Sequence, residues 1–250
     1  MSRSLLILVM VFTGRAILAD EADGWVARGL AAQARFDTPA ALAAFLKADQ
    51  ARPNNPCILQ AIARQYSDST LDTSDDAERL RRTEAALAYA KRALALAPKD
   101  PVNVLSMAVC YGKLGLGGDV GARIADAKLV KAYADRALTL NPNYDYAHHV
   151  LGEWNTDVAQ LGKTKLFVIK MIYGGMPPAS TAEGVAQLKI AVALAPRCAS
   201  HWADLGFAYL ANGQPAEAKE AFEKAIALPK SEKYDDEAKR LAKNALASNN

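Results

Sequence analysis

His149 and Glu153 are the pair of side chains best suited to bind a metal ion in this sequence. They are four residues apart, so on a helix they share one face and could hold one ligand. Zinc needs three or four ligands, and apart from the neighbouring His148 the sequence has one more histidine, His201. His148 itself falls in an apolar stripe. We therefore predict no metal and no cofactor, and we interpret His149 and Glu153 as a structural pair.

The sequence shows no pattern typical of covalent or phosphate chemistry. It has no G-x-S-x-G motif, and the glycine-rich segment at 112–121 lacks the Gly-Lys-Ser/Thr ending of a phosphate-binding loop. Cys57, Cys110 and Cys198 are odd in number and far apart, so we expect small buried thiols, not a disulfide framework or a zinc site. We expect no catalytic residues, and therefore a protein that is not an enzyme.

The composition is that of a globular protein with ample core material. Of the 250 residues, 51% are hydrophobic and 23% are charged. Alanine and leucine are frequent, which favours helix. The net charge of +3 is too small to indicate a nucleic-acid surface, and acids and bases are interleaved along the chain. We predict no nucleic-acid partner.

Residues 199–229 contain the clearest structural pattern, a pair of amphipathic helices. Asn212-Gly213 separates them, and Pro215 opens the second where its missing N–H has no effect. Each helix carries an apolar stripe at helical spacing. The stripes consist of Trp202, Leu205, Gly206 and Tyr209, then Ala218, Phe222 and Ala225.

The same pattern recurs along the chain, in each case ending at a proline. The predicted pairs are 22–53, 56–98, 101–142, 145–196 and 199–229. A charged amphipathic helix follows at 231–247 and would cap the last pair. We predict an all-α solenoid of about five antiparallel helix pairs with a C-terminal capping helix, forming one domain over 22–248.

The spacing W-x2-L-G-x2-Y, then A-x3-F-x2-A and a proline, resembles the tetratricopeptide (TPR) repeat. This resemblance implies a right-handed superhelix of helix pairs. Residues 147–196 are also similar to a narrower family, the regulator of microtubule dynamics proteins, which implies an all-helical domain without catalytic activity. That similarity rests on Ala147, His148, His149, Leu151, Gly152 and Trp154. Eukaryotic members associate with microtubules or organelle membranes, an association that does not suit an exported chain.

The N-terminus resembles a secretory signal peptide. Arg3 precedes the apolar run Leu5–Phe12, and a cleavage site could follow Ala19. The run is too short to span a bilayer, which needs roughly 20 apolar residues. We expect residues 1–19 to be removed and the mature chain, without a transmembrane span, to be periplasmic or secreted. The alternative is a short buried helix.

The first helix of each predicted pair would line an inner face of the solenoid, where a guest could bind. This face is apolar at several pairs and polar in the fourth, which suits a protein or peptide partner or, alternatively, a lipid or other apolar ligand. The same apolar residues could instead be packed by neighbouring helices. The predicted inner-face residues are Arg64, Val102, Leu105, Val109, Lys113, Tyr146, His149, Glu153, Asp157, Phe207 and Leu210.

The segment 163–176 interrupts the fourth pair and has two interpretations. Phe167, Lys170, Ile172 and Tyr173 could contact a membrane surface or a lipid. Alternatively, the segment packs over an exposed seam of the helix pair or fills the groove. We favour the packed arrangement, because amphipathic segments inside repeats usually bury their apolar side.

Overall fold

Helices are the only regular elements in residues 21–115 and 117–248, the part of the chain that the computed structural model describes. The predicted signal peptide at 1–19 lies outside these residues. The chain divides into two compact units, the first ending at Pro98 and the second beginning at Lys99. The all-α, TPR-like architecture is confirmed.

The first unit contains two helix pairs. A helix over residues 21–34 is followed by α2 (Thr38–Ala51), then by α3 (Pro56–Ser69), the short 3-10 helix η1 (Thr70–Asp72) and α4 (Asp76–Leu96). Gly29 lies against the ring of Phe45, where a Cβ would come within 2.6 Å of a ring carbon. This is the small-against-large contact that the repeat pattern predicts. Cys57 on α3 is exposed, so the prediction of three buried thiols is wrong at that position.

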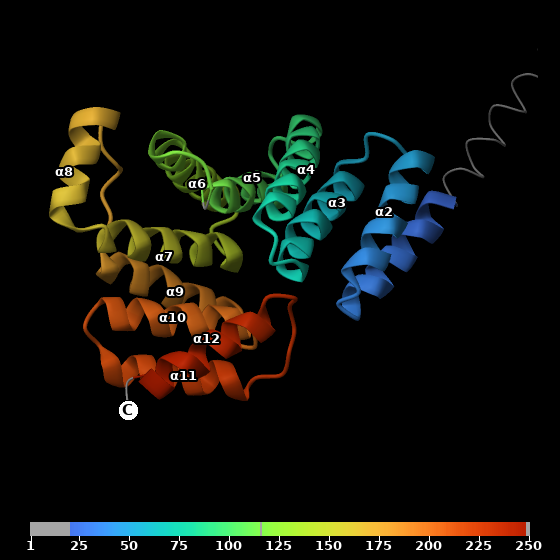
Figure 1. The fold of residues 1–250 in the computed structure, drawn as a ribbon. Coiled ribbons are helices and arrows are strands. Elements are labelled where there is room, and N and C mark those ends of the chain that lie inside the picture. Colours follow the sequence, from blue (N-terminus) through green and yellow to red (C-terminus); the bar gives the residue numbers. More distant parts are fainter. Residues whose placement is uncertain (1–20, 116, 249–250) are drawn as a thin grey trace, which may run out of the picture. The chain divides into compact units, whose positions relative to one another are not determined.

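The second unit contains the other three pairs and two additional helices. The pairs are α5 (Pro101–Leu114) with α6 (Val120–Leu140), α7 (Asp145–Gln160) with α9 (Thr181–Leu194), and α10 (Ala199–Ala211) with α11 (Pro215–Ala227). The additional helices are α8 (Gly162–Tyr173) and α12 (Asp235–Ser248). Figure 1 shows α7, α9, α10 and α11 stacked in succession.

Two glycines let α7 and α9 approach closely. A Cβ on Gly152 would lie 2.4 Å from Cγ of Leu188, and one on Gly184 would lie 2.2 Å from Oγ1 of Thr156. Real Cβ atoms do not make such contacts, so any larger residue would push the helices apart. This close packing holds α7 in position next to α10.

The C-terminal helix α12 packs against α10 and α11 through Ala238 and Ala242. Asp235, which is fully buried, joins it to α10. The carboxylate of Asp235 accepts hydrogen bonds from the backbone N–H of Ser200 (3.1 Å), Ser231 (2.7 Å) and Glu232 (2.9 Å). The helix therefore begins at Asp235 and not at residue 231 as predicted, because the preceding turn folds around this side chain.

The insertion differs from the expected packed arrangement. It forms α8, and none of the 12 residues of this helix is buried. Figure 1 shows α8 standing away from α9, α10 and α11. The prediction that this segment covers a seam is therefore wrong. Among the described residues, no helix has the length and apolar character needed to cross a bilayer.

Candidate functional site

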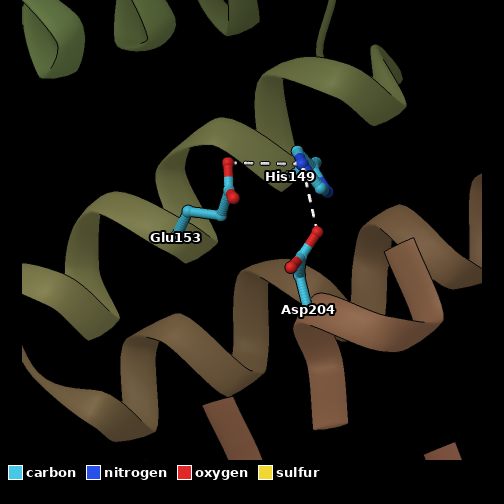
Figure 2. Close-up of side chains that lie close together, drawn as sticks. All are labelled: His149, Glu153 and Asp204. Carbon is cyan, nitrogen blue, oxygen red and sulfur yellow. Dashed lines mark ion pairs between the residues drawn. The ribbon is translucent and has the colours of Figure 1, made fainter. Parts of the chain in front are cut away.

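Ionisable side chains gather between α7 and α10 in the second unit. Asp145, His149, Glu153 and Asp157 follow one another at intervals of four along one face of α7, and His201 and Asp204 face them from α10. We call these six residues the His149 cluster. Figure 2 shows its centre, where His149 lies between the two carboxylates of Glu153 and Asp204.

The two histidines form a chain of hydrogen bonds with the carboxylates. Nε2 of His201 lies 3.1 Å from Oδ2 of Asp145, and the Nδ1 atoms of His201 and His149 are 3.0 Å apart. Nε2 of His149 is 3.3 Å from Oε2 of Glu153 and 3.6 Å from Oδ2 of Asp204. Ionised carboxylates only accept hydrogen bonds, so this chain needs three protons on four ring nitrogens. The two rings together therefore carry one positive charge.

Burial and charge set the ionisation of the cluster in opposite directions. Burial disfavours a charged His149, but Glu153, Asp204 and Asp145 outweigh this effect and raise the pKa of His149 to about 9. Burial also disfavours a charged Glu153, yet the neighbouring His149 lowers the pKa of Glu153. Burial and the charge of Glu153 raise the pKa of Asp204. Glu153 is therefore the ionised partner and Asp204 the carboxyl that keeps its proton longer.

One carboxylate oxygen of the cluster is buried beside His149 without a hydrogen bond among the described residues. Oδ2 of Asp204 is buried and accepts no hydrogen bond from the described residues. The Asp204 side chain is 13% exposed, while that of Glu153 is 44% exposed and Asp157 is open to solvent. Glu153 and Asp157 are thus accessible from outside, and these two acids are suited to a cation.

Three side chains of the cluster could hold a divalent metal. One ligand atom each from His149, Glu153 and Asp204 lie within 4.8 Å of one another. In a tetrahedral zinc site with metal–ligand bonds of ~2.0–2.1 Å, neighbouring ligand atoms lie ~3.3 Å apart. Nε2 of His149 lies 3.3 Å from Oε2 of Glu153 and 3.6 Å from Oδ2 of Asp204, and both distances are close to this value. The sequence offers His149, Glu153 and His201 as possible ligands, whereas Asp204 is not among the residues predicted from it. Its spacing of three from His201 was the available signal, since it places both on one face of α10.

Other candidate residues have structural roles. The expected pairing of His149 with Glu153 is present. The ring nitrogens of His148 lie 2.6 Å from Oε1 of Gln187 and 2.9 Å from the carbonyl oxygen of Pro142, so this side chain is held outside the His149 cluster. Burial raises the pKa of the Cys110 thiol to about 12, which makes it a poor nucleophile.

The predicted inner-face residues lie in several environments. Tyr146 packs edge-on against His201, with ring centres 5.0 Å apart. Leu105 is buried, and Phe207 and Leu210 lie against the core shared with α12. Val102 is exposed, and Val109 and Lys113 are partly exposed. Arg64, in the first unit, pairs with Asp68 at 3.6 Å. The structure therefore brings together Tyr146, His149, Glu153 and Asp157 of this set.

A surface pocket of about 310 Å³ reaches the cluster from the side of Asp145 and Tyr146. Arg197, Cys198 and Glu232 also line it. The sequence does not predict this pocket, because its walls come from three segments that are far apart in the chain.

Comparisons with known proteins agree with the fold and identify a family model. A family model described as regulator of microtubule dynamics protein 1-3 matches residues 20–250. Regulator of microtubule dynamics protein 1 of Bos taurus is 30% identical over 127 residues, and that of Homo sapiens is 32% identical over 111 residues. These matches cover 50% and 44% of this chain and 40% and 35% of the relatives, so the chain matches well under half of their length.

Solved structures with similar folds are TPR-type proteins of low sequence identity. A TPR protein of Thermus thermophilus aligns with a TM-score of 0.66 at 20% identity, covering 90% of this chain and 99% of that one. MamA from Desulfovibrio magneticus RS-1 aligns with a TM-score of 0.50 at 16% identity, covering 84% and 95%. At such identities the similarity shows the fold alone.

Proposed function

Because the chain belongs to the regulator of microtubule dynamics family and has a TPR-like fold, we propose that it is an exported, non-enzymatic scaffold that binds a protein or peptide. The observation that carries the choice of binding surface is the His149 cluster. Its acidic side faces outward at Glu153 and Asp157, and a buried oxygen of Asp204 has no hydrogen-bond donor among the described residues.

The charges of the cluster favour a partner with a basic side chain. Four carboxyl groups face two imidazole rings that share one positive charge, so an additional cation compensates the excess of acid. A lysine or arginine from a bound segment would donate hydrogen bonds to the outward-facing carboxylates of Glu153 and Asp157. Charge-assisted hydrogen bonds of this kind are stronger than neutral ones. Tyr146 adds an aromatic surface beside the charged centre.

Selection from a random peptide display library tests this function. We expect enrichment of peptides that contain lysine or arginine, and weaker binding of the selected peptides to the Glu153→Gln/Asp157→Asn double variant by about tenfold or more, given ~1.4 kcal/mol per factor of ten. Glu223→Gln, an exposed acid on α11 in the same unit, is the matched control and should bind as the wild type does.

Two outcomes would overturn this assignment. Selected peptides that bind the double variant as tightly as the wild type would place the binding surface elsewhere. Binding of Zn²⁺ by the wild-type protein but not by Asp204→Asn, together with a selection that shows no basic preference, would assign the cluster to a metal.

A second candidate function is transport of a lipid or other apolar ligand, favoured by the exposed apolar side chains of α8. It has less support at the predicted inner face, where Leu105 is buried and Phe207 and Leu210 pack against the core shared with α12. Native mass spectrometry after gentle purification should detect a co-purified lipid if this candidate is correct. A single ligand-free mass would count against it.

Export rests on the N-terminal sequence pattern, Arg3 followed by the apolar run Leu5–Phe12. The intact mass of the protein expressed with its own N-terminus should correspond to a chain that begins at Asp20. An uncleaved mass together with a cytoplasmic fraction would refute export.

A further inference from the structure

We propose that α8 is a membrane-surface helix that inserts its apolar face into an anionic bilayer. This proposal does not depend on the peptide-binding function, because it concerns other residues of the second unit. The exposed side chains of α8, their order around the helix and their charge carry it.

Four large apolar side chains of α8 are directed into solvent. Phe167, Val168, Met171 and Ile172 are 64%, 47%, 71% and 65% exposed. Their spacing of one, four and five residues places them side by side on one face of the helix. Isolated exposed apolar residues are ordinary, but four adjacent ones on a single helix form a patch that normally has a partner.

The opposite side of α8 faces the protein. Leu166 and Ile169 are partly buried, and both lie on the side of the helix away from the exposed patch. The carbonyl oxygen of Tyr173 accepts a hydrogen bond of 2.8 Å from Nζ of Lys128 on α6. The C-terminal end of α8 is thereby attached to the second unit while the apolar patch is left open. Figure 1 shows this helix at the margin of the unit.

The charges around the patch favour an anionic surface. Lys163 and Lys170 border the apolar face on one side and Lys165 borders it on the other. Residues 158–182 contain these three lysines and no aspartate or glutamate, whereas elsewhere acids and bases are interleaved. An apolar face bordered by lysines is the arrangement of helices that lie in the plane of an anionic membrane.

A second copy of the chain fits this surface less well. Two copies joined through α8 would bring the same three lysines of each chain together, and no acid of this segment could compensate them. A bilayer of anionic lipid supplies both apolar chains and negative headgroups. The helix is too short to cross a bilayer, so it would lie along the surface.

Co-sedimentation of the full chain with lipid vesicles tests the proposal. We expect binding to vesicles of phosphatidylcholine with 30% phosphatidylglycerol (about one lipid in three, enough for a negative surface potential), and at least tenfold weaker binding to pure phosphatidylcholine. Added salt should weaken the binding because it screens the lysines. Phe167→Ser/Ile172→Ser should reduce the affinity at least tenfold, and Lys163→Gln/Lys165→Gln should remove most of the salt dependence.

The controls separate a lost surface from a lost fold. None of the α8 residues is buried, so both double variants should keep the wild-type circular dichroism and melting temperature. Ile190→Ser removes an apolar side chain that is 40% exposed on α9 and should bind vesicles as the wild type does.

Three results would overturn the proposal. The first is no sedimentation of the wild type with anionic vesicles. The second is equal sedimentation of the wild type and Phe167→Ser/Ile172→Ser. The third is a concentration-dependent dimer that the same double variant abolishes, in the absence of vesicle binding, which would assign the patch to a second copy of the chain.

Discussion

Raising the pH from 6 to 10 should destabilise the second unit, because His149 loses its proton in that range. Burial disfavours the charged ring, but the facing carboxylates raise the pKa of His149 from 6.5 to about 9 in the folded protein. Between these two values the folded state holds a proton that the unfolded state has already released. The stabilisation is therefore complete below about pH 6.5 and is lost as the pH approaches about 9.

The size of the effect follows from the pKa difference. A change from 6.5 to about 9 corresponds to about 3 kcal/mol, and no large discount for solvent screening applies because the His149 side chain is 10% exposed. Asp204 acts in the same direction, since burial raises its pKa and its folded form also releases a proton over this range. The two losses are not added, because both groups share the same local charge.

Urea unfolding monitored by circular dichroism at several pH values measures the effect. We expect the free energy of unfolding to fall by about 3 kcal/mol between pH 6.5 and pH 9. We expect His149→Gln to be less stable at pH 6.5 and to lose stability less steeply over this interval, with the remaining slope due to Asp204. His148→Gln removes a neighbouring imidazole outside the hydrogen-bonded chain and should retain the slope due to His149. A wild-type stability that stays constant from pH 6.5 to pH 9, or an equal slope in His149→Gln, would refute the charged-ring assignment.

Three further predictions concern packing and exposure. Gly152→Ala should lower the free energy of unfolding by about 2–4 kcal/mol, because its Cβ would lie 2.4 Å from Cγ of Leu188 on α9. Gly112→Ala is the control, because its Cβ would make only an ordinary contact at 3.8 Å. This variant should be neutral or more stable by up to ~1 kcal/mol. Asp235→Ala should cost about 3 kcal/mol in thermal or urea unfolding, since it leaves the buried N–H of Ser200 and two partly buried N–H groups without an acceptor. A thiol reagent should modify Cys57 rapidly in the native protein and Cys110 only on unfolding.

The helix pairs could be predicted because each is defined by local signals. Prolines at Pro56, Pro101 and Pro215 begin helices in the structure, as their lack of an N–H allows. The pairing of Gly206 with Phe222 follows from spacing alone, and a Cβ at Gly206 would come within 2.5 Å of the Phe222 ring. Such contacts join neighbouring helices and repeat along the chain, so one clear repeat is enough to locate the others.

The His149 cluster could be predicted only in part. The spacing of four along α7 identifies His149 and Glu153, but the contact with His201 joins residues 52 positions apart. Asp204 shares one face of α10 with His201, but this local spacing does not show that the face meets α7. The sequence therefore identifies the ligand types on one helix, and the structure is needed to find the acid that completes the group.

The error at α8 has a different physical origin. The segment 166–173 is apolar on nearly every side, so its periodicity does not indicate which face is covered or whether any face is. Burial also requires a complementary surface, and the small residues that admit a neighbouring helix, such as Gly152 and Gly184, already serve the contact between α7 and α9. Glycines with positive φ lie at both ends of α8, at Gly162 and Gly174, and turn it out of that contact. The exposed apolar face of α8 has no complementary surface in its own unit and is consistent with a binding site for something outside the chain, which is the reason to test it against lipid.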